Sequence, residues 1–225
     1  MTQSLAHPRR IARRYVLRFG AAATLATPLA ACGAAAHWHN VDITHSMPAL
    51  AFDMDRASDG KLVTAADYRG QVVALYFGYT NCPDACPTTL SNLSAVLDRM
   101  GKDAAHMQVL FVTVDPNRDS LQRLKQYTAA FSPRMDGLRG TPDALARLAR
   151  RYRAAYSVTP ASPGHPYTVT HATAIYVFDA TGDARLLVAS MASTKPDIGG
   201  TASDLTRLVN ERPGGGVVGR LLRMV

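Results

Sequence analysis

The hydrophobic residues of this chain form short continuous runs that alternate with helical repeats. Three runs rich in β-branched and aromatic residues predict strands buried on both faces, at residues 72–77, 107–115 and 172–179. Apolar residues three or four positions apart predict amphipathic helices, which begin at either Pro83 or Pro87, near residue 120, at residue 141 and near residue 198. A strand, a helix and a strand in this order form a right-handed parallel crossover, so the pattern predicts an α/β domain.

Weaker patterns complete the domain. Residues 51–54 and 61–64 flank a turn-rich segment and predict an N-terminal hairpin, and residues 185–190 are expected to pair with 172–179. Residues 132–140 are expected to be irregular with a short strand, and the prolines and glycine within 157–170 predict a loop. This order is typical of a thioredoxin-like fold, a central mixed sheet flanked by helices, over residues 48–211. Ligands of such folds gather beyond the carboxyl ends of the parallel strands.

The positive charge of the chain is concentrated at its N-terminus. Lysine and arginine number 25 against 17 acidic residues, a formal charge of +8, and five of the arginines precede residue 32, where there is no acid. The rest of the chain therefore carries 20 basic against 17 acidic residues. No nucleic-acid partner is expected.

Residues 1–31 are typical of a lipoprotein signal peptide. An arginine-rich start is followed by an apolar segment of small residues, too short and too alanine-rich for a membrane span. It ends in Leu29-Ala30-Ala31-Cys32, which resembles a bacterial lipobox and predicts that Cys32 is lipidated. Residues 12–18 also resemble a twin-arginine export signal. The expected location is the periplasmic side of a bacterial membrane; the alternative is a hydrophobic helix with an incidental cysteine.

Two segments show no regular spacing of hydrophobic residues. Residues 32–47 are predicted to be a tether between the lipid anchor and the domain, and residues 212–225 a flexible tail. The tether holds His37, His39 and His45, but a flexible segment fixes no metal geometry.

Cys82 and Cys86 lie four positions apart where a strand is followed by a helix. The positive end of the helix is expected to favour their thiolates. Two thiolates favour Cu(I), and an added imidazole also accommodates Cu(II) or zinc. A redox pair and a structural disulfide are alternatives, although so short a loop gains little entropic stabilisation from a disulfide.

His171 is the candidate third ligand. It precedes a strand expected beside residues 72–77, so its loop should overhang the cysteines. A lone histidine at a strand start is more often simply packed, and the residue alone leaves both interpretations open.

Two interpretations are also open for Asp115 and Asp119, which either orient the site or belong to an ordinary strand-ending turn. The arginines near residue 150 suggest either an anionic partner or, more commonly, a solvated helix face.

Three motifs together resemble the Sco/SenC family, copper proteins that mature cytochrome c oxidase; they cover residues 78–90, 114–119 and 169–173. The resemblance implies a thioredoxin-like fold, attachment to a membrane, and copper, as Cu(I) and Cu(II), bound by Cys82, Cys86 and His171. Thr170 departs from the acidic residue that usually precedes this histidine, which affects the orientation or basicity of the imidazole. A lipobox in place of a transmembrane anchor is a second departure.

The resemblance implies a membrane-tethered copper metallochaperone that delivers copper to the CuA centre of cytochrome c oxidase subunit II. Other periplasmic copper chaperones or thiol reductants would be further partners. The main alternative is an enzyme, a thiol-disulfide oxidoreductase in which Cys82 and Cys86 reduce the cysteines of the same client. Thioredoxin-type enzymes, however, place two residues between their cysteines and a cis proline before the facing strand, whereas this chain has three residues and no such proline. A peroxiredoxin-like peroxidase would not need the paired cysteines.

Overall fold

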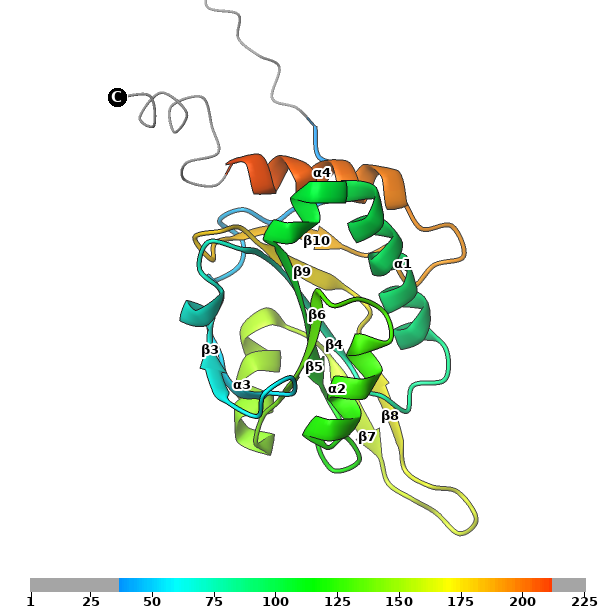
Figure 1. Cartoon of the computed structure of the whole chain (residues 1–225). Helices are drawn as coiled ribbons and strands as arrows, with labels where there is room; N and C mark the ends of the chain where they lie inside the picture. The colour runs from blue at the N-terminus through cyan, green and yellow to red at the C-terminus, as the bar shows by residue number, and fades with distance from the viewer. Residues whose placement is uncertain (1–36, 212–225) are drawn as a thin grey trace, which may run out of the picture. The chain divides into compact units, whose positions relative to one another are not determined.

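A single mixed sheet forms the centre of the computed structural model, which describes residues 37–211 (Figure 1). Its eight strands lie in the order β1-β10-β9-β4-β5-β6-β2-β3. The parallel strands β4 (Val72–Gly78), β5 (Met107–Thr113) and β6 (Met135–Arg139) occupy the middle. The antiparallel strands are β1 (Val41–Asp42), β2 (Asp53–Arg56), β3 (Leu62–Thr64), β9 (Ile175–Phe178) and β10 (Ala184–Val188). The predicted central mixed sheet is confirmed.

Helices cover both faces of this sheet (Figure 1). Buried residues of α1 (Ala85–Met100), α2 (Leu121–Ala129) and α4 (Ile198–Glu211) share one hydrophobic cluster, and those of α3 (Pro142–Tyr152) belong to the other. Short 3₁₀ helices, η1 (Ala65–Tyr68) and η2 (Gly101–His106), precede β4 and β5. Ser120 and Thr141 cap α2 and α3 by accepting from the backbone N–H groups of Arg123 and Ala144, so these helices start as predicted.

Strand β4 shows why a continuous apolar run was the correct signal. All seven of its residues are buried. Because side chains alternate along a strand, Ala74 and Tyr76 enter the cluster beneath α1, whereas Leu75 and Phe77 enter the cluster beneath α3. A strand covered on both faces needs apolar residues at every position. The C-terminal end of this strand leads directly into the cysteine loop.

The predicted loop over residues 157–170 is wrong. Strands β7 (Tyr156–Thr159) and β8 (Thr168–His171) form an antiparallel hairpin outside the main sheet, in which Tyr156 lies opposite His171. All three prolines lie between the two strands, where they interrupt no ladder hydrogen bond. His171 is therefore the last residue of β8, and it does not begin β9. Figure 1 shows the hairpin extending well beyond the sheet.

The predicted tether over residues 32–47 is also corrected from residue 37 onward. Asp204 of α4 accepts hydrogen bonds from the backbone N–H groups of His39 (3.2 Å) and Asn40 (2.9 Å), and Arg207 lies 3.9 Å from the ring centroid of Trp38. Because these attachments are polar and aromatic, the sequence of this segment shows no regular spacing of hydrophobic residues. Cys32, the rest of residues 1–36, and residues 212–225 lie outside the described part of the chain. The signal peptide, the lipidation of Cys32 and the flexible tail stay predictions.

None of the helices between residues 37 and 211 is long and apolar enough to cross a membrane.

Candidate metal centre

Cys82, Cys86 and His171 lie together at one end of the sheet. Their ligand atoms are all within 4.8 Å of one another, and within residues 37–211 no other group of three or more His, Cys, Asp or Glu residues is arranged to hold a metal ion. The Cys86 Sγ is 3.2 Å from the His171 Nε2, and the backbone N–H of Cys86 donates to the Cys82 Sγ at 3.4 Å. Both cysteines are free thiols. The structure thus brings together the three residues that the sequence singled out.

The cysteine positions follow from how β4 passes into α1. Cys82 lies in the intervening loop, where its N–H donates to the carbonyl of Tyr79 at 3.2 Å, and Cys86 lies in the first turn of α1. The helix begins at Ala85, so Pro87 and not Pro83 occupies its first turn. Gly78 ends β4 directly beneath Cys86: a Cβ at this position would lie 2.7 Å from the Cys86 Sγ. The close approach of strand and thiol requires glycine.

The imidazole of His171 is oriented for use as a ligand. Its Nδ1 is 3.0 Å from the carbonyl of Ala172, which assigns the proton to Nδ1 and leaves the Nε2 lone pair facing the thiols. The rings of Tyr76 and Tyr79 lie edge-on to it, with centroids at 6.0 and 5.7 Å. Burial lowers the pKa of His171, so the ring is neutral at pH 7. A neutral imidazole with a fixed tautomer is a competent metal ligand.

The expectation that the positive end of the helix favours the thiolate form is wrong for Cys86. This side chain is fully buried, and burial raises the pKa of its thiol to about 12. Desolvation of the charged form therefore outweighs the partial positive charge at the start of α1. The Tyr76 hydroxyl lies 3.7 Å from the Cys86 Sγ. The free protein holds Cys86 as a thiol, and a bound metal ion must displace its proton.

The two acids that follow β5 support the site from outside. Asp119 is fully buried and accepts from the N–H of Thr80 (3.0 Å), from its hydroxyl (2.6 Å) and from the hydroxyl of Thr113 (2.6 Å). It therefore ties the cysteine loop to the end of β5. Asp115 accepts from the Tyr167 hydroxyl at 2.8 Å and pairs with Arg118. Sequence reasoning missed the supporting tyrosines, although Tyr76 and Tyr79 closely flank Gly78 in the cysteine motif.

Asp119→Ala should lower stability and loosen the cysteine loop. Removal of the carboxylate leaves three donors without their partner, one buried and two partly buried, which we expect to cost roughly 3 kcal/mol. For a domain of this size, that corresponds to a fall in Tm of roughly 6–12 °C, measured by thermal unfolding. Asp119→Asn retains an acceptor oxygen and should lose less; equal melting temperatures for wild type and the alanine variant would contradict this role.

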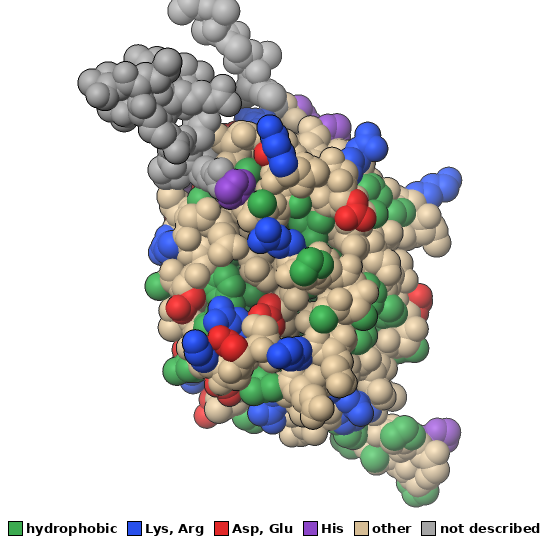
Figure 2. Space-filling view, viewed as in Figure 1, with side chains coloured by type: hydrophobic (Ala, Val, Ile, Leu, Met, Phe, Trp, Pro, Cys, Tyr) green, Lys and Arg blue, Asp and Glu red, His purple; other side chains and the backbone are tan. Residues whose placement is uncertain are grey.

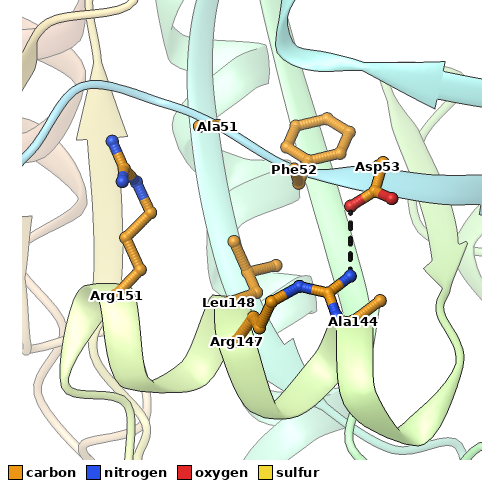
Figure 3. A pocket seen from close by; sticks show the side chains of 7 residues that line it. All are labelled: Ala51, Phe52, Asp53, Ala144, Arg147, Leu148 and Arg151. Atoms are coloured by element: carbon orange, nitrogen blue, oxygen red, sulfur yellow. Dashed lines mark ion pairs between the residues drawn. The ribbon is translucent and has the colours of Figure 1, made fainter.

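The arginine-rich face of α3 borders a groove that contains none of the three candidate ligands (Figure 3). Arg147 pairs with Asp53 at 3.8 Å, and Arg151 donates to the carbonyl of Ala49 at 2.9 Å. Figure 2 shows basic and acidic side chains interspersed over the visible face of the molecule. These contacts favour the solvated-face interpretation over a dedicated site for an anionic partner.

A family model described as SCO1/SenC matches residues 51–209, which is more than half of the chain. The chain belongs to the SCO1/SenC family. It is 40% identical over 125 residues to Protein SCO2 homolog, mitochondrial, of Bos taurus, covering 55% of this chain and 47% of that protein. The chain thus spans about half the length of the curated relatives it matches.

Solved structures of the family share the fold. The structure of Bradyrhizobium japonicum ScoI with copper bound matches with a TM-score of 0.63 and 34% identity, over 71% of this chain and 98% of that chain. Yeast Sco1 with copper bound matches with a TM-score of 0.62 and 31% identity, over 73% of this chain and 90% of that chain. The predicted thioredoxin-like fold is confirmed, as is the resemblance to the Sco/SenC family.

The predicted location is corrected by the same comparisons. The curated relatives of Bos taurus, Homo sapiens and Saccharomyces cerevisiae are all named mitochondrial. These names point to the mitochondrion, and the expectation of a bacterial periplasm is wrong. A lipobox resemblance rests on four residues of small and apolar type, a pattern that also arises from composition alone in an alanine-rich leader.

Proposed function

We propose that this chain is a copper metallochaperone of cytochrome c oxidase assembly, held at a membrane through its N-terminal region. Copper is its cargo, bound by Cys82, Cys86 and His171 and delivered to the CuA centre of oxidase subunit II. The observation that carries the proposal is the geometry of the three ligand atoms, all within 4.8 Å of one another. Membership of the SCO1/SenC family and the two copper-bound relatives support it.

The donor set suits copper in both oxidation states. Two thiolates are soft ligands that favour Cu(I), and the imidazole adds the nitrogen that Cu(II) prefers. His171 is neutral with its Nε2 free, so it needs no deprotonation to bind. Cys86 is fully buried whereas Cys82 is only partly buried, so the set has one covered sulfur and one sulfur near the surface. An acceptor would first reach the copper from the side of Cys82 and would then exchange the remaining ligands one at a time.

The second candidate function is reduction of the cysteines of subunit II. It is supported by the two free thiols, whose sulfur atoms lie within 4.8 Å of each other, close enough to become a disulfide after small movements. In that reaction the two thiols lose two electrons and two protons to the client disulfide, and the client gains two thiols. A disulfide between Cys82 and Cys86 removes both thiolates, so the oxidised chain should not bind copper.

Transfer and reduction are separated by His171→Ala. In the first assay, the copper-loaded chain is mixed with metal-free, reduced subunit II, and formation of the CuA absorption is measured. In the second assay, the reduced chain is mixed with disulfide-bonded subunit II, and the thiols formed on subunit II are counted. Wild type should transfer copper. The variant should bind Cu(II) at least roughly tenfold more weakly because one ligand is gone, and should transfer poorly, but should reduce subunit II at the wild-type rate.

The matched control is His165→Ala, which removes an exposed imidazole at the hairpin tip, outside the ligand group. It should behave as wild type in both assays. Failure of the wild-type chain to transfer copper, together with reduction of subunit II, would replace the metallochaperone with the reductase. Equal Cu(II) affinity of His171→Ala and wild type would remove His171 from the site.

A further inference from the structure

The hairpin that carries His171 is joined to the body of the domain by side chains from two neighbouring loops. The Tyr79 hydroxyl, from the loop after β4, donates to the carbonyl of Val169 at 3.1 Å. The Tyr167 hydroxyl donates to Asp115 at 2.8 Å, and the guanidinium of Arg118 lies 3.9 Å from the Tyr167 ring centroid. We call Tyr79, Asp115, Arg118 and Tyr167 the hairpin clasp.

The backbone of the hairpin adds little to this attachment. Strands β7 and β8 pair only with each other, and at their base the N–H of Ala172 donates to the carbonyl of Ala155 at 2.8 Å. Most residues between 157 and 168 are exposed, including Val158 at 52%, and residues 154–178 contain no Asp, Glu, Lys or Arg. Figure 2 shows the tip projecting into solvent. Besides the packing of Tyr156, Tyr167 and Val169 on the core, the clasp is what fixes the hairpin.

The clasp lies very close to the ligand that it would position. Val169 precedes His171 by two residues on β8, and Tyr167 lies directly before this strand, four residues from His171. Tyr79 contacts the hairpin twice, because its ring also lies edge-on to the imidazole of His171, with the ring centroids 5.7 Å apart and the ring planes at 89°. Arg118 joins the two tyrosines: it lies 5.8 Å from the Tyr79 ring and donates to the carbonyl of Tyr167 at 3.4 Å. A displacement of β8 would therefore move the Nε2 that now lies 3.2 Å from the Cys86 Sγ.

We propose that Tyr79 and Tyr167 are positioning residues: through the clasp they hold His171 over the buried Cys86, and release of the clasp withdraws the imidazole and exposes the thiol. The positional part rests on the geometry alone. For copper, we infer that the closed clasp completes the Cu(II) site and that the open clasp presents Cys86 to an acceptor. This part rests on the proposed function. Opening the clasp breaks the two hydroxyl bonds and the arginine contacts and uncovers the packed side chains of the hairpin, and these losses together set its cost.

Alkylation of Cys86 in the reduced, copper-free chain tests the positional part. Cys86 is fully buried and its Sγ lies 3.2 Å from the His171 Nε2, so we expect it to react when the hairpin opens. Tyr79→Phe keeps the ring against His171 but loses one neutral hydrogen bond, and should speed alkylation about fivefold. Tyr167→Phe keeps the ring against Arg118 but loses a bond to a carboxylate, and should speed it about tenfold or more. Site-resolved mass spectrometry measures Cys86 separately from Cys82.

Tyr152→Phe is the matched control. Its hydroxyl accepts from the N–H of Ala51 and donates to the carbonyl of Ala49, both at 3.0 Å, and neither partner belongs to the clasp or the hairpin. It should lower the melting temperature about as much as Tyr79→Phe and leave the Cys86 rate unchanged. Equal Cys86 rates in wild type and both clasp variants, or an equal rise in Tyr152→Phe, would overturn the clasp.

The copper part has its own measurement. In the Cu(II)-loaded chain, Tyr79→Phe should weaken the nitrogen coupling in the electron paramagnetic resonance spectrum and shift the thiolate-to-copper absorption, while Cu(I) affinity stays within about twofold of wild type. Spectra identical to wild type would overturn the role of the clasp in the copper site. A wild-type chain that binds no copper would instead refute the proposed function, and the alkylation rates would still decide the positioning role.

Discussion

Replacing Cys86 with serine is expected to lower the affinity of the chain for Cu(I) more than a hundredfold. Structural zinc sites with four thiolate or imidazole ligands bind with apparent free energies of roughly 10–16 kcal/mol, or roughly 3 kcal/mol per ligand, and each 1.4 kcal/mol is tenfold; we take the same scale for Cu(I). Serine is a hard, protonated donor that replaces one of only two soft ligands. Competition with a chelator of known Cu(I) affinity measures the change.

The variant should still fold, so the result reports on the site. The serine hydroxyl would lie near the hydroxyl of Tyr76, which now lies 3.7 Å from the Cys86 Sγ and 3.4 Å from Thr89. Met191→Leu is the matched control, because it removes another fully buried sulfur with little change in volume and is not part of the ligand group. An affinity for Cys86→Ser within threefold of wild type would show that this thiol is not a ligand.

The elements of the central sheet could be predicted because the residue type at each position reflects whether that position is buried. Strands β4 and β5 are covered on both faces, so their sequences are continuous apolar runs, and α3 shows its buried face at helical spacing. β6 gave a weaker signal, since its five residues include Asp136 and Gly137. A short strand was expected there, but its central place beside β5 could not be read from that sequence.

The β7–β8 hairpin was missed because its attachments are of a kind that sequence patterns do not show. Its strands are mostly exposed, so they lack an apolar period, and the prolines of the tip dominate the local signal. Hydrogen bonds such as that from Tyr167 to Asp115 join residues 52 positions apart. The same limit applied to residues 37–47, whose contacts with Asp204 span about 165 positions.

The candidate site was predictable in its members but not in its electrostatics. Spacing placed both cysteines at the start of a helix, and this suggested that the helix would favour thiolate at both. The depth of Cys86 depends on the end of β4 and on the hairpin above it, and no local pattern encodes that depth. From the residues alone His171 stayed ambiguous; the motif resemblance, not its spacing, selected it.

Gly78→Ala is expected to lower the affinity for Cu(I) tenfold or more, although Gly78 is not itself a ligand. The added Cβ would lie 2.6 Å from Cε2 of Phe111 and 2.7 Å from the Cys86 Sγ, closer than real Cβ contacts. Phe111 is fully buried in the core and cannot move away, so the thiol and the first turn of α1 must shift. Overpacking of this kind costs roughly 1–3 kcal/mol, and a shift of about 1 Å is enough to spoil the geometry of a preorganised ligand set.

The matched control for this crowding is Gly137→Ala in β6. Its Cβ would meet the Cβ of Leu124 at 2.7 Å and that of Ala57 at 3.2 Å, so a comparable clash arises away from the ligand group. Both variants should melt lower, by roughly 2–4 °C for each kcal/mol lost, but only Gly78→Ala should lose Cu(I) affinity, by tenfold or more. If Gly78→Ala were destabilised yet bound copper as wild type does, the close approach of β4 to Cys86 would serve packing alone. If both variants lost copper equally, the affinity would depend on global stability and not on this contact.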